Sequence, residues 1–273
     1  MTWFGKGKFK KGNIPWNKGK VKEQRKRTRV MFIPDPHIDK HLPFDPLYKF
    51  AADFQPHTIV FGGDMFDFGY LSHWNSANFE NIGHDNIAKQ IERDAEIVRD
   101  IIAKFKAIHS VDEIVFIIGN HEIWFYKYQE KYQKRIKQTF SDLLHAEELG
   151  VKIVEFGQVY QKGKLRIRHG ECYGTDNPAK QAIMRSHHSI LFGHCHTLKV
   201  WTAFSDMDKN SFIAVASSCW AKIPMFKYLD SRPNSYSNGF AIAWVKSNGN
   251  FQLLPISASP AGSFIYNNKE YEA

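Results

Sequence analysis

The sequence predicts an α/β protein. From residue 30 onward, short apolar runs of strand length alternate with segments whose apolar residues recur at helical spacing. Glycines and polar residues repeatedly follow the apolar runs, which is typical of open sheets that bind ligands at the carboxyl ends of their strands. The 273 residues, 43% of them hydrophobic, suffice for a sizeable core. No apolar run approaches the roughly 20 residues of a membrane-spanning helix.

The first half of the chain is expected to hold three buried strands and two helices. The apolar runs at residues 29–34, 58–62 and 113–119 each end at a glycine or a proline, which favours buried strands. Between the first two, Asp45 is the expected N-cap of a helix and Pro46 its first residue. A long helix is expected between the second and third strands, because six apolar residues recur there at steps of three and four: Ile87, Ile91, Ala95, Val98, Ile102 and Phe105.

The second half is richer in strand signals. A short helix is expected at residues 178–186 and a longer one after Asn120, and the Asn248-Gly249 pair predicts a turn between the last two strands. Six strands are expected, at residues 151–155, 165–169, 189–193, 212–216, 240–245 and 251–255.

The basic charge is concentrated in the first thirty residues. The formal net charge is +9, but residues 1–30 carry eleven Lys and Arg and one Glu, a net +10, so the other 243 residues sum to −1. The basic segment is rich in Lys, Gly and Asn and cannot bury enough apolar surface to fold alone. We therefore expect a basic tail over residues 1–29 and one domain over residues 30–273.

The cysteines and the N-terminus predict a cytoplasmic protein. Cys172, Cys195 and Cys219 are scattered and form no CxxC pair, which excludes a disulfide scaffold and is typical of a reducing compartment. No apolar stretch follows the basic N-terminus, so no signal peptide is expected.

Five short polar motifs stand out, four of them directly after predicted strands. Each motif alone is commonly a turn or an ordinary histidine, but five of them in order along one chain are not expected by chance. Residues two apart in extended chain point to the same side, so the pairs separated by one residue can reach one ion. The motifs are Asp35-Pro36-His37, Gly62-Gly63-Asp64-Met65-Phe66-Asp67, Gly119-Asn120-His121-Glu122, His169-Gly170 and Gly193-His194-Cys195-His196.

Together these motifs offer oxygen and nitrogen ligands for two divalent metal ions. Such a mixed ligand set suits several first-row ions; Mn²⁺ is our first choice, with Fe, Zn or Mg as alternatives. Two dications, two carboxylates and one hydroxide leave a charge of about +1, which attracts a phosphate group. The candidate ligands are Asp35, His37, Asp64, Asn120, His169, His194 and His196.

The ordered set DxH, GDxxD, GNHE, H and GHxH resembles the calcineurin-like metallophosphoesterases over residues 35–196. The resemblance implies a four-layer α/β/β/α sandwich of two mixed β-sheets flanked by helices. It also implies that Asp35, His37 and His196 bind a first metal, that Asp64 bridges both metals, and that Asn120, His169 and His194 bind the second. His121 matches the histidine that protonates or stabilises the leaving oxygen, and Asp67 matches a carboxylate that orients that histidine.

The reaction expected from this set is phosphoester hydrolysis by a metal-bridging hydroxide, with His121 as the general acid. Protein phosphatases of this superfamily carry an Arg-Gly clamp after GDxxD, whereas this chain has Phe68-Gly69, which argues against a protein phosphatase. Lys127, Arg185 and His73 are other candidates for a phosphate contact.

Nucleic acid or nucleotides are the expected substrates, which makes the protein a phosphodiesterase or nuclease. A basic tail beside a neutral domain is suited to holding a polyanion, although a solvated tail without a role in turnover is an equal alternative. Residues 9–19 resemble short Lys/Gly/Trp segments of phage-type homing endonucleases. Aromatic residues crowd two of the motifs; we favour core packing for them, with base stacking as the alternative. They are Phe66, Phe68, Tyr70, Trp74, Trp124, Phe125, Tyr126 and Tyr128.

Other functions remain open from the sequence. Residues 61–74 and Asn238-Gly239-Phe240 look like phage and prokaryotic members of the family, which would place a phage-encoded protein in the host cytoplasm. The runner-up function is a phosphomonoesterase for a small phosphate or nucleotide. A nucleic-acid-binding protein with an inactive site is a third class, against which the complete ligand set argues. A homodimer is possible, as in several relatives.

Overall fold

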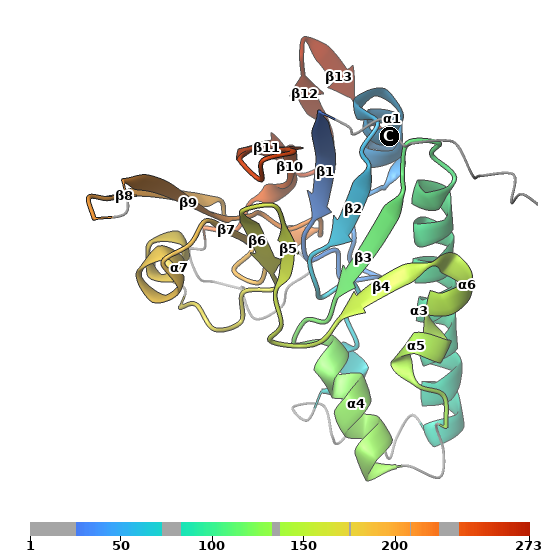
Figure 1. The fold of residues 1–273 in the computed structure, drawn as a ribbon. Coiled ribbons are helices and arrows are strands. Elements are labelled where there is room, and N and C mark those ends of the chain that lie inside the picture. Colours follow the sequence, from blue (N-terminus) through green and yellow to red (C-terminus); the bar gives the residue numbers. More distant parts are fainter. Residues whose placement is uncertain (1–25, 73–82, 133–136, 175, 208, 224–234) are drawn as a thin grey trace, which may run out of the picture.

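Two mixed β-sheets pack face to face between helices in the computed structural model, which describes residues 26–72, 83–132, 137–174, 176–207, 209–223 and 235–273 (Figure 1). Helix α7 (Pro178–Ser186) covers the outer face of one sheet, and α3 (His84–Lys106) lies on the outer face of the other. The expected α/β class and the four-layer arrangement of two mixed sheets flanked by helices are confirmed.

The larger sheet has six strands in the order β11-β10-β1-β2-β3-β4. Strands β1 to β4 run parallel, whereas β10 pairs antiparallel with β1 and β11 antiparallel with β10. The turn at Asn248-Gly249 joins the last two strands as expected, with Gly249 at a φ of 83°. The strands are β1 (Arg27–Ile33), β2 (Thr58–Phe61), β3 (Glu113–Ile117), β4 (Val151–Val154), β10 (Asn238–Lys246) and β11 (Phe251–Ala258).

The smaller sheet has five strands in the order β5-β6-β7-β9-β8. Its three inner strands run parallel, and each edge strand is antiparallel to its neighbour. A separate two-stranded hairpin follows β11. The strands of the smaller sheet are β5 (Tyr160–Lys162), β6 (Leu165–Arg168), β7 (Ile190–Phe192), β8 (Lys199–Ser205) and β9 (Asn210–Ala216), and those of the hairpin are β12 (Phe264–Tyr266) and β13 (Lys269–Tyr271).

Side chains of each strand point alternately to the two faces of the sheet, so the core consists of one layer between the sheets and one beneath the helices. In β1, Val30 and Phe32 belong to the cluster between the two sheets, whereas Met31 and Ile33 belong to the cluster beneath the helices. Because successive side chains of a strand point to opposite faces, a continuous apolar run is buried on both sides. Burial on both faces explains why the parallel strands could be predicted from unbroken apolar segments of the sequence.

The helices cover the outer faces of both sheets, and their starts follow local sequence signals. Helix α1 begins at Asp45, so Asp45 is its first residue and Phe44 its N-cap; the expected capping role of Asp45 is wrong by one position, and its carboxylate stands in the first turn instead. Helix α7 keeps the predicted bounds, with the Asn177 side chain accepting a hydrogen bond from the Lys180 amide. The remaining helices are α1 (Asp45–Phe54), the 3₁₀ turn η1 (Gly69–Leu71), α4 (Glu122–Lys131), α5 (Phe140–Leu143) and α6 (Ala146–Leu149).

Several short elements were not predicted, namely β5, β8, β12, β13, α5 and α6. Helices α5 and α6 have only four residues each, too few to show a helical apolar period. Strand β8 lies at the edge of its sheet and most of its residues are exposed, so its sequence contains no apolar run. Strand β1 starts at Arg27 and therefore includes three residues of the expected tail. In the part of the chain that the structure describes, no helix has the length and apolar character needed to span a membrane.

Candidate metal centre

The carboxyl ends of strands from both sheets meet at one edge of the sandwich. Asp35, Asp64 and Asn120 follow the parallel strands β1, β2 and β3 of the larger sheet, and His169 and His194 follow β6 and β7 of the smaller one. Parallel strands place their carboxyl ends together, so residues that are far apart in the sequence converge there.

Asp35, His37 and His196 form the first cluster. One side-chain oxygen or nitrogen from each lies within 4.8 Å of the others, and all three residues are buried. The Nε2 atoms of His37 and His196 are 3.2 Å apart, and His196 Nε2 lies 3.7 Å from Asp35 Oδ1. Three potential ligands for one ion therefore converge at this point.

Asp64, His169 and His194 form a second cluster of the same kind. His169 Nε2 lies 3.4 Å from Asp64 Oδ2, 3.2 Å from His194 Nδ1 and 2.9 Å from Asn120 Oδ1. Asp64 also groups with His37 of the first cluster and with His121, so its carboxylate stands between the two clusters. All seven residues predicted from the motifs are thus brought into one site.

The donor atoms fit divalent cations. Burial lowers the pKa of His37 and His196, and burial together with His169 lowers the pKa of His194 to about 4, so these rings are neutral and offer nitrogen lone pairs. Neutral imidazoles and carboxylates are the ligands that first-row metals prefer. Buried carboxylates that lie this close together are stabilised by cations between them.

Charge coupling in the site centres on Asp64 and His169. Burial lowers the pKa of His169, but the carboxylates of Asp64 and Asp35 outweigh it and raise that pKa to about 10. Burial raises the pKa of Asp64, but His169 and His121 outweigh it and lower that pKa well below its usual value. The pKa of Asp35 is raised, mainly by burial. The charges of Asp64 and His169 thus favour each other.

The backbone is strained at five of the expected ligands. Asp35, His37, Asp64, His194 and His196 all have positive φ angles, between 45° and 64°. A non-glycine residue in this region costs roughly 1–3 kcal/mol, and such strain is concentrated at functional sites. The strain turns each of these side chains toward the common centre.

Two glycines make room for the carboxylates. A Cβ atom on Gly119 would overlap Asp64 Oδ1, and one on Gly193 would overlap Asp35 Oδ2. The backbone before Asn120 and His194 can therefore approach the acids closely, and the His194 amide donates to both carboxylate oxygens of Asp35 at 2.9 Å. This explains why glycine precedes both of these ligands in the motifs.

His121 lies at the mouth of the site and is held by main chain. Its Nδ1 lies 2.5 Å from the carbonyl oxygen of Asp67, which can only accept, so Nδ1 carries the proton. Its Nε2 faces the site, 3.9 Å from Asp64 Oδ2, and the ring packs on Trp124 with ring centroids 4.1 Å apart.

The Asp67 side chain lies nearer to Lys40 and His37 than to His121. Its Oδ1 lies 2.7 Å from Lys40 Nζ and 3.3 Å from His37 Nδ1, but 3.8 Å from His121 Nδ1. Burial raises the pKa of Asp67, yet His37 and Lys40 outweigh it and lower that pKa well below its usual value. The carboxylate thus orients an expected metal ligand, and the Asp67 carbonyl orients His121.

Glu122 has a positioning role that the motifs alone do not reveal. Its buried carboxylate accepts hydrogen bonds from the amides of Asp64, Phe66 and Gly119 at 2.8 to 3.0 Å. It therefore ties the loop after β2 to the loop after β3. Burial raises the pKa of Glu122 to about 7, with the Asp64 charge as a second cause. The GNHE motif contains the residue, but two of its three partners, the amides of Asp64 and Phe66, lie more than fifty positions away.

Most of the aromatic residues near the motifs belong to the core. Phe66, Phe68 and Phe125 are fully buried and stack on one another, and Tyr128 is 4% exposed. The favoured packing role is confirmed for these four. Trp74 lies outside the described residues. Phe68 occupies the position of the protein-phosphatase clamp, and its buried ring cannot reach a phosphate.

The expected phosphate contacts are less central than the ligands. Arg185 donates to the carbonyl of Cys172, and Lys127 is exposed on α4. His73 lies outside the described residues. Lys40, which the sequence reasoning missed, is the cation that the structure places closest to Asp67.

Fold and site together define a metal-dependent phosphoesterase: two mixed sheets with paired clusters of Asp and His at their strand ends. A family model for calcineurin-like phosphoesterase matches residues 28–212, about two thirds of the chain. The chain belongs to this family, as the resemblance of its motifs predicted. No curated protein matches the chain.

The substitution Glu122→Gln tests the positioning role. Its amide group replaces one acceptor oxygen with a donor that opposes a backbone N–H, so we expect Mn²⁺ affinity to fall about tenfold or more, because breaking a buried charge-assisted hydrogen bond costs about 1.5–3 kcal/mol. Isothermal titration with Mn²⁺ measures the change. Glu130→Gln, on the same helix but exposed, is the matched control. Unchanged affinity in a folded Glu122→Gln protein would contradict the assignment.

Proposed function

We propose that this phosphoesterase cleaves phosphodiester bonds in nucleic acid or nucleotides, with two divalent ions at the strand-end clusters. The observation that carries the proposal is the pair of clusters joined by Asp64. The proposed ligands of the first ion are Asp35, His37 and His196, those of the second are Asn120, His169 and His194, and Asp64 is proposed to bridge them. Mn²⁺ remains the first choice of metal, since the ligands are oxygen and imidazole nitrogen.

Two divalent ions, when bound, supply Lewis acidity and a nucleophile from water at neutral pH. The residues of the chain position these ions and the substrate. The left-handed backbone at Asp35, His37 and Asp64 fixes the ligand directions, and Glu122 holds the two loops in register. Burial of the ligands excludes bulk water and so strengthens every interaction with a phosphate group.

His121 is proposed as the general acid. The Asp67 carbonyl fixes its Nδ1–H, so a second proton on Nε2 faces the site and can pass to the leaving oxygen. The carboxylate oxygens of Asp64 and Asp67 lie 3.9 Å from Nε2 and 3.8 Å from Nδ1 of this ring. Such a donor contributes typically 10²- to 10⁴-fold to the rate.

The proposal of a nucleic-acid substrate rests on charge. The basic N-terminal segment supplies the positive charge that a polyanion needs, while the rest of the chain sums to −1. The segment joins the domain at the amino end of β1, whereas Asp35 follows the carboxyl end of the same strand. Twenty-five residues can span up to about 80 Å when extended, so this attachment point does not prevent contact with a strand bound at the site.

His121→Gln tests the assigned reaction. We expect hydrolysis of bis(p-nitrophenyl) phosphate by the Mn²⁺-loaded protein to fall at least about 100-fold, because the proton donor is lost. Metal binding should persist, because His121 is not a proposed ligand. EDTA should abolish the wild-type activity and Mn²⁺ restore it. His109→Gln, on the loop after α3, is the matched control. Full turnover in His121→Gln would contradict the role assigned to this residue.

Deletion of residues 1–25 tests the DNA contact. The deletion must stop before Arg27, because Arg27–Arg29 pair with β10. We expect weaker binding of a fluorescein-labelled oligonucleotide and a shallower salt dependence, since each lost phosphate contact lowers the slope of log K against log[salt] by about 0.7–0.9. Fluorescence anisotropy at several salt concentrations measures both. Turnover of the small diester should be unchanged, and equal DNA affinity of both proteins would exclude a contact through the tail.

A further inference from the structure

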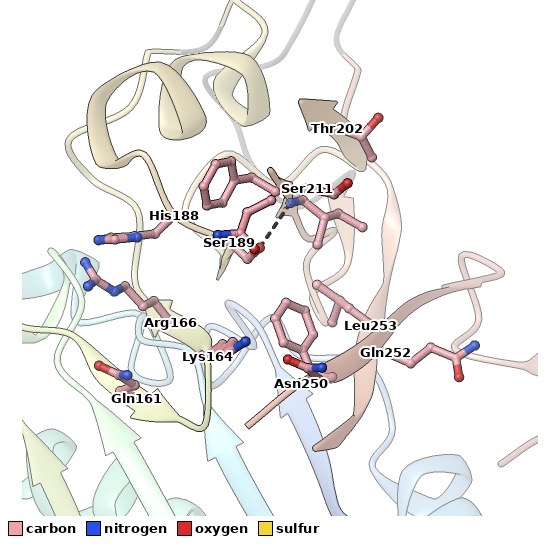
Figure 2. A pocket seen from close by; sticks show the side chains of 14 residues that line it. Gln161, Lys164, Arg166, His188, Ser189, Thr202, Ser211, Asn250, Gln252 and Leu253 are labelled. Carbon is pink, nitrogen blue, oxygen red and sulfur yellow. Dashed lines mark hydrogen bonds between the residues drawn. The ribbon is translucent and has the colours of Figure 1, made fainter. Parts of the chain in front are cut away.

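A second hollow lies at the end of the sandwich opposite the metal centre. It is a crevice of about 890 Å³ between the edge strand β11 of the larger sheet and the strands β6 and β9 of the smaller one (Figure 2). Lys164 and Ser189 line it and precede β6 and β7, whereas His169 and His194 follow these strands. The crevice and the metal centre are therefore separated by the length of the strands. Its volume lies in the range of pockets that bind small molecules, about 300–1,000 Å³.

The charge of the crevice is positive. Lys164, Arg166 and His188 line it, and its described lining includes neither Asp nor Glu. The ion pairs found among the described residues include neither Lys164 nor Arg166. Figure 2 shows Arg166 and His188 on one side of the crevice and Lys164 at its base. Two cations without a carboxylate partner form a site for an anion.

His188 adds a hydrogen-bonding group beside these cations. Partial burial and the charges of Arg166 and His187 lower the pKa of His188 below 6.5, so its ring is neutral at pH 7. A neutral imidazole can donate one hydrogen bond to a phosphate oxygen. The guanidinium of Arg166 is the group best suited to bidentate contact with phosphate, and Lys164 acts as a point charge.

The remaining wall is apolar. Phe251 and Leu253 of β11 and Phe212 and Ile213 of β9 line it, and all four side chains are only partly buried. Phe251, Leu253 and Ile213 pack against the cluster between the sheets, so they form its open edge. A flat ring that entered here would cover apolar surface that water now contacts, and a base on an aromatic side chain gains stacking energy of about 1–3 kcal/mol in general.

Polar groups at the rim complete the site. Asn250 and Gln252 carry amide donors and acceptors, and Ser211 of β9 carries a hydroxyl group. Ser189, at the floor, already accepts a hydrogen bond from the Ile213 amide at 3.1 Å, which fixes the spacing of β7 and β9 at this point. Amide side chains are the groups that pair with the edges of nucleobases.

We propose that this crevice binds a nucleoside monophosphate unit, with the phosphate at Arg166, Lys164 and His188 and the base between Phe251 and the wall formed by β9. The unit is either a free nucleotide or one nucleotide of a strand. No proposed metal ligand lines the crevice, so the site is independent of the proposed hydrolysis.

The test is binding of 2′-deoxyadenosine 5′-monophosphate to the full-length protein, measured by isothermal titration with Mn²⁺ loaded and again in EDTA. The crevice should bind in both conditions, whereas binding at the metal centre requires the metal. We expect Arg166→Gln and Lys164→Gln each to weaken the EDTA-resistant binding about tenfold, through loss of a charge-assisted contact. Lys89→Gln, an exposed lysine of α3, is the matched control. Circular dichroism checks that each variant is folded.

Three comparisons divide the possible outcomes. Deoxyadenosine, which lacks the phosphate, should bind at least about tenfold more weakly than the nucleotide, because the charged contacts are lost. The substitution Phe251→Leu, which keeps an apolar side chain but removes the ring, should weaken nucleotide binding. An oligothymidylate that competes with the nucleotide identifies a strand as the source, and one that does not identifies the free nucleotide. Absence of saturable binding in EDTA, equal affinity for inorganic phosphate, or equal affinity of Arg166→Gln and Lys89→Gln would each overturn the proposal.

Discussion

The structure depends on one electrostatic constraint: two carboxylates and four imidazoles are drawn into a single, largely buried site. Asp35, Asp64 and His169 are each at most 2% exposed. Burial of charged groups is costly unless they are paired, and burial of polar groups is costly unless they find partners. The carboxylates of Asp64 and Asp35 outweigh burial and raise the pKa of His169 to about 10. Divalent ions held by these residues would balance the negative charge of the acids.

The fold supplies the means to meet this constraint. Parallel strands from two sheets deliver the ligands to one edge, and the strained backbone at five of these residues turns the side chains inward. Glu122 holds three backbone amides of two loops, and Gly119 and Gly193 allow those loops to approach the acids. The surrounding core of stacked Phe66, Phe68 and Phe125 is rigid enough to maintain the geometry. The stability of the whole fold thus compensates for the unfavourable backbone conformations at the site.

The sequence predicted the central strands and the convergence of the seven motif residues well, because both leave local signals. Strand β2 is buried at every position, so its sequence is an almost unbroken apolar run, and the motif residues follow directly. Edge strand β8 leaves no such signal, because most of its residues are exposed. The order of motifs identified the family, which the match over residues 28–212 confirms.

Contacts between distant segments were beyond prediction from local patterns. Nothing near Asp67 indicates that its carboxylate lies on Lys40 and His37 while its carbonyl holds His121. Glu122 is visible in its motif, yet its bond to the Asp64 amide spans 58 positions. The crevice at the opposite end is built from five separate segments that carry no motif. Such contacts depend on strand register and on packing between distant segments, which cannot be predicted from local patterns in a single sequence.

Metal stoichiometry is the most direct measurement of the central claim. The full-length protein, reconstituted with Mn²⁺ and freed of excess metal, should carry two ions per chain by inductively coupled plasma mass spectrometry. Asp64→Asn should lose at least one of them, because this carboxylate stands between the clusters, whereas the exposed Asp206→Asn should keep both. A wild-type protein that retains no metal, or an Asp64→Asn protein that retains as much as the wild type, would contradict the account.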